Sequence, residues 1–332
     1  MLRFLSRSEI DTVAWDACVA GSAQRVVYGY SWYLDAVLPQ PGWKWVGVVD
    51  VGETGAYRAV MPVPLRRKFV AGVAYDWVVH QPLFCQFLDV FSPDETCDPT
   101  LFLRAVQQRY RYGSVLCLRP YPNSSLGFDV VRQRTTHVLD LSAGYEIIRR
   151  NYTRDRQVNL RRAERYGWTI IDATDPLPLL TLFRDYHADG IDGGVGDWAY
   201  DILRQLIHEL QARKLVIIRY ALSDGRVEAG ALFVREGNRI VYLFNAASET
   251  SRRGNARTLL IDRIIQENAG RDSTDKPILF DFESPHKASI VDFYRSFGAT
   301  ETVFREVRWN RLTLVERAAK AVVTWIRQTG RP

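Results

Sequence analysis

The sequence predicts an α/β protein of the α+β kind, made of two halves that each carry helices on the faces of a mixed sheet. Its 332 residues exceed what a single hydrophobic core usually holds, which favours two domains. In the later half, strand pairs joined by tight turns are followed by the order strand, helix, strand, helix, strand. This order is typical of a mixed sheet covered by helices. We expect an N-terminal half over 1–140, a C-terminal half over 141–310 and a helical tail over 311–332.

The first half is predicted to combine two helices with several short strands. Residues 9–20 and 93–111 show helical spacing, and two strand-like runs are separated by Gly52 and Gly55, which indicates a hairpin. The second run contains two prolines, so we expect it at a sheet edge or at a bulge. The predicted strands of this half cover 45–50, 56–65, 115–118 and 129–141.

The second half begins with one long polar helix over residues 144–166, which contains seven arginines and ends at Gly167. Tight turns at Asp224–Gly225 and Gly237–Asn238 join successive strands. Further helices are expected over 176–190, 197–213, 253–269 and 286–296. The strands are expected over 168–172, 215–222, 227–235, 240–246, 277–283 and 301–310.

The charge balance is mildly basic, with 44 lysines and arginines against 38 aspartates and glutamates and a formal net charge of +6. This excess suits an anionic partner such as CoA, and DNA binding is not expected. Neither a signal-peptide pattern nor an apolar run of about 18 residues is evident, so we expect a cytoplasmic protein. The four cysteines lack CxxC spacing, and no metal site is predicted.

A turn after a predicted strand has the composition of an anion-binding site. Residues 251–256 (SRRGNA) precede an apolar helix, whose first amides and dipole favour a phosphate. Gly254 and Ala256 would let a pyrophosphate approach the backbone, and Arg252 and Arg253 add positive charge. The alternative is an ordinary arginine-glycine turn at the start of an amphipathic helix.

Two carboxylates end the strand predicted over 277–283. Strand alternation places Asp281 and Glu283 on one face, where either could remove a proton from an amine or hydroxyl. They could instead be solvated acids or partners of nearby arginines. His286 is an alternative base, although a histidine near a helix start is more often a cap or a surface residue.

These features resemble the GNAT superfamily of acyltransferases, whose acyl-CoA loop follows the pattern Arg/Gln-x-x-Gly-x-Gly/Ala. The chain keeps the glycine and the small residue of that loop but begins it with Ser251, and residues 293–299 (FYRSFGA) are similar to the family's helix-ending signature. The resemblance implies that Tyr294 protonates the departing CoA thiolate, a role that suits a phenol. It also implies that acyl-CoA binds at a site whose backbone amides polarise the thioester carbonyl. The residues assigned to that donor site are Asn245, Ala246, Arg252, Arg253, Gly254, Asn255 and Ala256.

Residues 140–310 also resemble tandem GNAT-like proteins related to the Fem-type transferases of bacteria, in which an arginine-rich helix joins two GNAT-like halves. The helix of this chain matches that family's pattern at Arg154, Asn159, Leu160, Arg161, Arg162, Ala163 and Gly167. A glycine often follows the strand carboxylate in the family, whereas Ser284 and Pro285 stand there in this chain.

This resemblance implies three functions. The first is transfer of an acyl group from acyl-CoA to an amine or hydroxyl of a small molecule or a cell-envelope precursor. The second is Fem-type transfer from aminoacyl-tRNA to a peptidoglycan precursor, which ranks lower because no coiled-coil arm for tRNA is evident. The third is a non-catalytic GNAT-like binding module, suggested by Ser251 and by the unassigned base.

The acceptor side is predicted from position alone. Arg154 of the arginine-rich helix would contact substrate phosphates, and Trp77 and Phe84 would line an aromatic cleft. In the tail, residues 312–328 place apolar side chains on one helical stripe beside basic ones. We expect this helix to dock on the domain, with peripheral membrane contact as the alternative.

Overall fold

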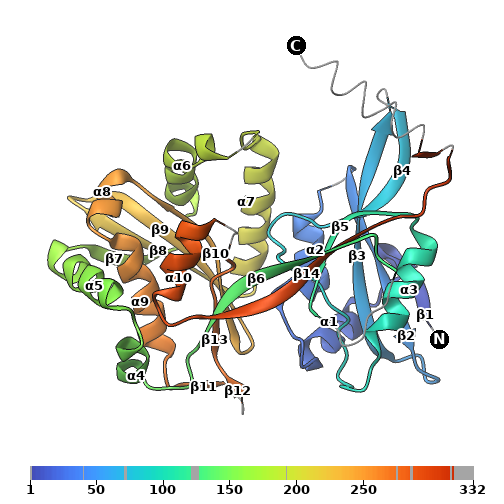
Figure 1. Cartoon of the computed structure of the whole chain (residues 1–332), viewed down its shortest axis with the longest axis horizontal. Helices are drawn as coiled ribbons and strands as arrows, with labels where there is room; N and C mark the ends of the chain where they lie inside the picture. Colours follow the sequence, from blue (N-terminus) through green and yellow to red (C-terminus); the bar gives the residue numbers. More distant parts are fainter. Residues whose placement is uncertain are drawn as a thin grey trace. The chain divides into compact units, whose positions relative to one another are not determined.

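The computed structural model describes residues 2–39, 41–70, 73–120, 127–191, 193–273, 276–284, 287–314 and 316–317. The chain divides into two compact units (Figure 1). The first unit comprises Met1–Arg134 together with Phe304–Pro332, and the second comprises Thr135–Val303. The sequence placed the boundary at 140 and kept the last strand with the second half, whereas the end of that strand belongs to the first unit. Most of the tail helix predicted over 312–328 lies outside the described residues.

The first unit is a sheet with helices packed along it. Its strand order is β1-β2-β3-β4-β5-β14, in which only β4 and β5 are parallel neighbours. These strands are β1 (Leu2–Ser6), β2 (Trp43–Val51), β3 (Tyr57–Val70), β4 (Val73–His80), β5 (Tyr112–Leu118) and β14 (Thr300–Asn310). The helices are α1 (Thr12–Gly21), α2 (Ser31–Val37) and α3 (Pro99–Arg109).

The proline-containing strand β3 lies inside this sheet and not at its edge, whereas the alternative, a bulge, is found where its register with β2 shifts between Tyr57 and Ala59. The prolines are compatible with an interior strand because β4 pairs only with Leu65–Val70 of β3. Pro62 and Pro64 therefore lie where β2 is the strand that pairs with β3, and their missing N–H groups cost no bond to β4.

The second unit is a mixed sheet of order β6-β13-β10-β9-β8-β7, in which β10 and β13 are parallel and the other neighbouring strands are antiparallel. Its strands are β6 (Val130–Asp140), β7 (Thr169–Ala173), β8 (Val216–Ser223), β9 (Arg226–Glu236), β10 (Arg239–Ala247) and β13 (Leu279–Asp281). Its helices are α4 (Tyr145–Arg150), α5 (Arg154–Tyr166), α6 (Leu177–Tyr186), α7 (Asp197–Ala212), α8 (Glu249–Arg253), α9 (Ala256–Asn268) and α10 (Ala288–Arg295).

Two predicted helices of this unit have different bounds in the structure. The single helix expected over 144–166 separates into α4 and α5, because Thr153 has extended backbone and caps α5 by accepting the Arg156 N–H at 3.3 Å. The helix expected over 253–269 corresponds to α9, which starts at Ala256 after Asn255, whose φ of +54° is left-handed, and the short helix α8 that precedes it was not predicted.

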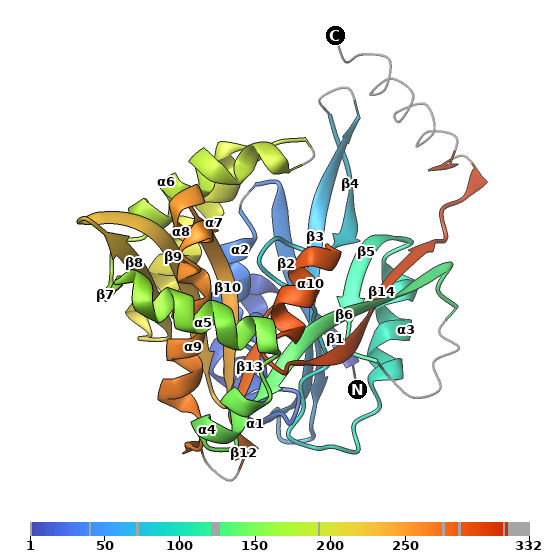
Figure 2. The same ribbon diagram turned by 60° about the vertical axis from the view of Figure 1, so that its left-hand side comes forward.

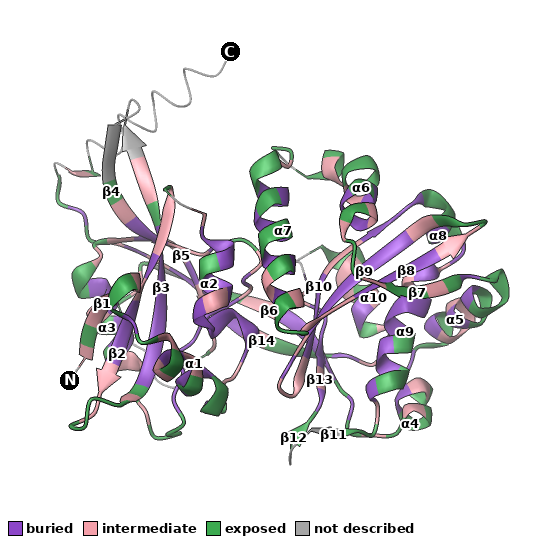
Figure 3. Ribbon diagram, turned by 180° about the vertical axis from the view of Figure 1, so that it is seen from behind, coloured by how far each residue is buried: buried purple, intermediate pink, exposed green. Residues whose placement is uncertain are grey.

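Helices cover both faces of the second sheet (Figures 1 and 2). Helix α6 packs on β9 and β10, and the Leu179 N–H donates to the hydroxyl of Tyr220 in β8 at 3.3 Å. On the other face, α5 and α9 form one buried cluster with the small residues Ala221, Ala229 and Ala231 of the sheet. Figure 3 shows the buried residues gathered on the strands and on the inner sides of the helices. Because alanine side chains are short, α9 can approach this face of the sheet closely.

A buried carboxylate fastens α4 and the start of α5 to α9. Asp262 of α9 is 2% exposed and accepts hydrogen bonds from the hydroxyls of Tyr145, at 2.8 Å, and Tyr152, at 3.0 Å. Burial is the largest influence on this carboxyl and raises its pKa above the usual value, while the two tyrosine hydroxyls oppose the shift.

We predict that Asp262→Asn stabilises the protein at neutral pH. Because the pKa of Asp262 is higher in the folded than in the unfolded chain, the folded state holds the proton at pH values where the unfolded state has lost it. Stability therefore falls as pH rises through that window above the ordinary carboxyl pKa. Urea unfolding at pH 4 and pH 7 should show the gap between variant and wild type widening with pH, and parallel pH profiles would contradict the prediction.

Candidate functional site

The turn between β10 and α9 has backbone N–H groups that are already hydrogen-bonded within the chain, unlike the free N–H groups of a phosphate-binding loop. The Gly254 N–H donates to Thr250 O at 2.9 Å, and the Asn255 N–H donates to Arg252 O at 3.4 Å. Two of the amides expected to meet a phosphate are therefore engaged within the chain. Helix α9 then starts at Ala256 without a side-chain cap, so its first turn still offers the unsatisfied amides of a helix N-terminus.

Gly254 is required by packing against an indole. A Cβ at this position would lie 2.4 Å from a ring atom of Trp168, which is far closer than van der Waals contact. The Trp168 indole N–H also donates to Gly254 O at 2.8 Å, and its ring stacks on Tyr166 with centroids 4.4 Å apart. The glycine of the predicted donor loop thus accommodates Trp168, which sequence inspection missed.

The two arginines of that loop lie on the surface. Arg252 reaches the carbonyl oxygen of Tyr186 at 3.4 Å, and Arg253 lies 3.9 Å from the exposed carboxylate of Glu249. Ala256, the small residue of the motif, is fully buried under the start of α9. The loop therefore presents its two cations at the surface, where each already has a contact within the chain.

Strand β10 continues past its parallel neighbour. Pairing with β13 covers only Arg239–Val241, and from Tyr242 onward the described structure gives β10 no strand partner on that side. Asn245 lies in this stretch, where its side-chain oxygen accepts from Arg257 at 3.1 Å, and the neighbouring Ala246 is buried. At the strand's end the Ala247 N–H donates to His187 Nε2 at 3.0 Å. Burial, with help from Arg252 and Arg257, lowers the pKa of His187, which suits its accepting role.

The two carboxylates of the predicted base pair occupy different environments. Asp281 is 0% exposed, and its carboxylate forms an ion pair with Arg239 at 2.6 Å and accepts the Thr136 hydroxyl at 2.8 Å. It also accepts the Glu283 N–H at 3.0 Å, because the chain leaves the strand after Asp281 and Glu283 has a left-handed φ of +48°. The strand alternation that was expected to put both acids on one face therefore stops short of Glu283, which is half-buried. His286 lies outside the described residues.

Tyr294 lies in α10 beside the open stretch of β10. Its ring is buried and stacks on Phe282 with centroids 4.7 Å apart and planes 29° apart. Burial raises the pKa of Tyr294 to about 12, with the Arg257 guanidinium opposing and the Glu283 carboxylate adding to the shift. These influences indicate that Glu283 and Arg257 lie within electrostatic reach of the phenol. The structure thus brings together a carboxylate, a guanidinium and a phenol.

Three further residues at this place were absent from the sequence-based assignment: Arg156, Arg257 and Tyr242. Arg156 could have been found from spacing, because it precedes Leu160 and Ala163 by four and seven residues, and all three lie on the buried face of α5. Arg154, which was assigned to substrate, is the exposed first residue of the same helix.

The predicted acceptor aromatics both belong to the first unit. Trp77 of β4 lies between the ammonium of Lys44, 4.2 Å from its ring centroid, and the guanidinium of Arg67, at 5.5 Å. Phe84 has a left-handed φ of +54°, and its carbonyl oxygen accepts the Tyr33 hydroxyl. Trp77 therefore already serves as a cation-π partner within the unit.

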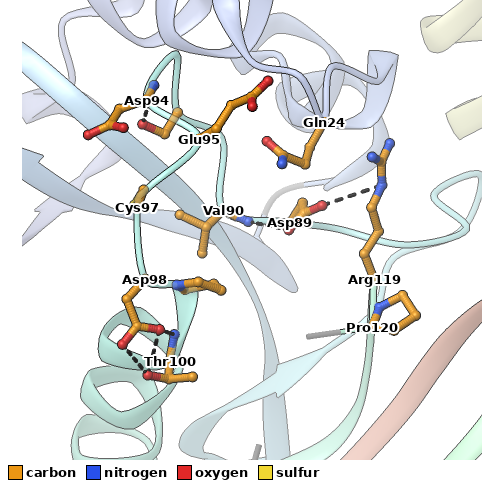
Figure 4. A pocket seen from close by; sticks show the side chains of 12 residues that line it. Gln24, Asp89, Val90, Asp94, Glu95, Cys97, Asp98, Thr100, Arg119 and Pro120 are labelled. Carbon is orange, nitrogen blue, oxygen red and sulfur yellow. Dashed lines mark hydrogen bonds and ion pairs between the residues drawn. The ribbon is translucent and has the colours of Figure 1, made fainter. Parts of the chain in front are cut away.

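The first unit also contains a cavity of about 510 Å³ near the start of α3 (Figure 4). Its lining includes four acidic residues, of which Asp89 pairs with Arg119 at 3.4 Å and Asp98 caps α3 through the Thr100 N–H at 2.9 Å. Neither Trp77 nor Phe84 is part of that lining. The cavity is therefore separate from the predicted acceptor residues and carries none of the chemistry assigned to the second unit.

The described residues provide neither a metal-binding group nor a membrane-spanning helix. No group of three or more histidine, cysteine, aspartate or glutamate side chains in that part of the chain is arranged to hold a metal ion. Within the same residues, no helix combines the length and apolar character that crossing a membrane requires.

Comparison with known proteins identifies the fold and a domain match in the second half of the chain. Residues 149–275 match the model of the acetyltransferase (GNAT) domain family. The structure of FemX aligns with a TM-score of 0.64 at 10% identity, covering 91% of this chain and 96% of that one. A tandem GNAT protein from the clavulanic acid biosynthesis pathway aligns with a TM-score of 0.50 at 12% identity, covering 93% and 98% of the two chains.

The C-terminal domain of a putative lysylphosphatidylglycerol synthetase from Agrobacterium fabrum aligns with a TM-score of 0.51 at 14% identity, covering 97% of this chain and 98% of that one. No curated protein matches the sequence. Residues 149–275 thus match a GNAT acetyltransferase domain, and the chain shares the fold of FemX and of a tandem GNAT protein. The predicted α/β fold class and the predicted resemblance to tandem GNAT and Fem-type proteins are confirmed.

Proposed function

We propose that the second unit is an acyltransferase that moves an acyl group from acyl-CoA to an amine or hydroxyl of a small molecule or a cell-envelope precursor. The observation that carries the proposal is the open stretch of β10 beside Tyr294, where a linear thioester can run along unpaired backbone. The GNAT domain match over 149–275 supports the reaction type. FemX and the lysylphosphatidylglycerol synthetase domain, which share the fold, support an acceptor from the cell envelope.

In this proposal the acceptor nitrogen or oxygen attacks the thioester carbonyl, forming a C–N or C–O bond as the C–S bond breaks. Glu283 takes the acceptor's proton, because it is the half-buried carboxylate near Tyr294, whereas Asp281 is held in its ion pair and positions the strand end. Amides near Asn245 and Ala246 polarise the carbonyl. Tyr294 donates its proton to the leaving sulfur, and its pKa of about 12 keeps it protonated until the thiolate forms.

Two variants test these roles, with acetyl-CoA as donor, a panel of amine and hydroxyl acceptors, and released thiol as the readout. We expect Glu283→Gln to lower kcat about 100-fold or more and Tyr294→Phe about 10- to 100-fold, within the range for lost general acid–base catalysis. The matched controls Glu249→Gln and Tyr186→Phe change exposed side chains and should keep wild-type rates. Full activity in Tyr294→Phe and Glu283→Gln would reject the assigned roles, and no binding of any acyl-CoA by calorimetry would reject the donor.

A second candidate is the Fem-type reaction with an aminoacyl-tRNA donor. It is favoured by the arginines exposed on α5, among them Arg154, Arg161 and Arg162. It predicts tRNA binding that weakens steeply with salt and weakens further in the triple Arg→Gln variant. Binding that is unchanged in that variant would reject this candidate, and acyl-CoA binding without thiol release would favour a non-catalytic module.

A further inference from the structure

Arg156 is a buried cation without an anionic partner. Its side chain on α5 is 6% exposed, its Nε donates to Ser296 Oγ at 2.8 Å, and its Nη1 donates to Thr258 Oγ1 at 2.5 Å. Both acceptors are neutral hydroxyls, and among the described residues Arg156 forms no ion pair. The carboxylate of Asp155 acts on it only from an exposed position on the adjoining residue.

This arrangement is energetically unusual because a buried ion costs several kcal/mol unless a counter-charge accompanies it. The faces of Phe293 and Phe297, whose centroids lie 4.1 and 4.8 Å from the guanidinium carbon, offset part of that cost. Burial lowers the pKa of Arg156 only to about 10, so the guanidinium stays charged at neutral pH. The described residues therefore hold a positive charge that none of them neutralises by an ion pair.

Arg257 adds a second cation to the same ring. Its guanidinium carbon lies 5.3 Å from the centroid of Phe293, and its Nη1 donates to the neutral Asn245 side chain at 3.1 Å. The described residues provide no carboxylate within ion-pair distance of Arg257 either. The two guanidinium groups repel one another, which is reflected in the lowering of the Arg156 pKa by Arg257. An anion between them would turn this repulsion into a paired site.

A buried hydroxyl provides independent evidence of a missing ligand atom. Tyr242 of β10 is 2% exposed, and its hydroxyl has no hydrogen-bond partner among the described residues. The Tyr242 ring lies 6.1 Å from the ring of Tyr294, and Arg257 contacts Asn245 of the same strand, so the hydroxyl belongs to the same locality. Buried polar groups are nearly always satisfied in folded proteins, and an exception commonly marks a group that awaits a ligand or an ordered water.

We propose that Arg156 and Arg257, assisted by the Tyr242 hydroxyl, bind one oxyanion of the ligand that occupies the second unit. Arginine forks match the oxygens of phosphate and carboxylate in two parallel hydrogen bonds, so the chemical class is a phosphate or a carboxylate. The proposal rests on the proposed function in one respect only, because it assumes that the ligand is an acyl donor or its acceptor. Both can carry such a group, and the experiment separates them.

The probe is inorganic pyrophosphate, titrated calorimetrically into the full-length protein at low ionic strength, where screening is weak. We expect saturable binding to wild type that weakens at least tenfold in Arg156→Met and in Arg257→Met. Arg165→Met on α5 and Arg263→Met on α9 are the matched controls, because both side chains are exposed on the same helices, and they should bind as wild type does. Equal affinity in wild type, Arg156→Met and Arg257→Met would overturn the proposal.

Two further arms identify the source of the oxyanion. Acetyl-CoA carries phosphates, whereas S-acetylpantetheine has the same thioester end without them. Weaker binding of acetyl-CoA but not of S-acetylpantetheine in Arg156→Met would assign the oxyanion to the donor. Unchanged binding of both, with pyrophosphate binding lost, would assign it to the acceptor. If acyl transfer fails but Arg156-dependent pyrophosphate binding persists, the proposed function falls and the oxyanion site stands.

Stability without ligand gives an independent readout. Replacing an uncompensated buried charge by an apolar side chain of similar size is often neutral or stabilising, so Arg156→Met should unfold at the same urea concentration as wild type or at a higher one. A structural arginine would behave in the opposite way. The Arg257→Met variant keeps Arg156 and changes only a half-buried side chain. If this variant loses stability but binds pyrophosphate with wild-type affinity, the proposal is overturned.

Discussion

Asp281→Ala is expected to lower the free energy of unfolding by about 3–5 kcal/mol, the range for removing one member of a buried ion pair. The loss arises because Arg239 would remain largely buried without its carboxylate and because the Thr136 hydroxyl and the Glu283 N–H would lose their acceptor. Urea denaturation followed by tryptophan fluorescence measures the change.

Glu283→Ala is the matched control, because Glu283 is half-buried and stands outside the strand. We expect a loss of stability of less than about 1 kcal/mol, as for most positions away from the core, together with loss of acyl transfer. The reverse result, a stable and inactive Asp281→Ala, would show that Asp281 itself acts as the base.

Gly254→Ala is expected to destabilise wild type by about 1–3 kcal/mol, the usual cost of overpacking. The new methyl group would meet the Trp168 ring 2.4 Å away, and the indole cannot retreat without giving up its hydrogen bond to Gly254 O. Trp168→Ala alone should cost about 3–5 kcal/mol through the cavity it leaves.

The double variant distinguishes this packing role from a direct ligand role. In Trp168→Ala the space beside Gly254 is open, so adding Gly254→Ala should cost little more, and the double-mutant cycle should give a coupling energy of at least about 1 kcal/mol. Additive costs would show that the glycine is needed for another reason, such as contact with a ligand. Loss of acyl-CoA binding in Gly254→Ala alone would therefore not identify the donor site, whereas loss in Arg257→Met would.

The fold was largely predictable because its strands and helices have strong local signatures. The hairpins of β8, β9 and β10 follow turn residues at Asp224–Gly225 and Gly237–Asn238, and these signals do not depend on distant contacts. The return of the chain's last strand to the first unit was not predictable, since it depends on which strand Thr300–Asn310 pairs with and not on its own sequence.

The site was predictable only in its outline. Tyr294 and Glu283 came from a family signature and from their place at a strand end, and the structure puts them within electrostatic reach of one another. Arg156 was missed because it stands among seven arginines of a helix that was treated as uniformly polar, although its spacing to Leu160 marks it as facing inward. No local signal distinguishes Gly254 as a partner for an indole 86 residues away.

The division of the chain has a consequence for its biosynthesis. The second unit is one uninterrupted stretch, Thr135–Val303, so it can complete its contacts while the ribosome is still adding residues. The first unit cannot, because β5 must wait for β14, whose Trp309 ring lies against the bare face of Gly113. The strands that precede the second unit are made before it, yet the edge of β5 stays unpaired until β14 has been made.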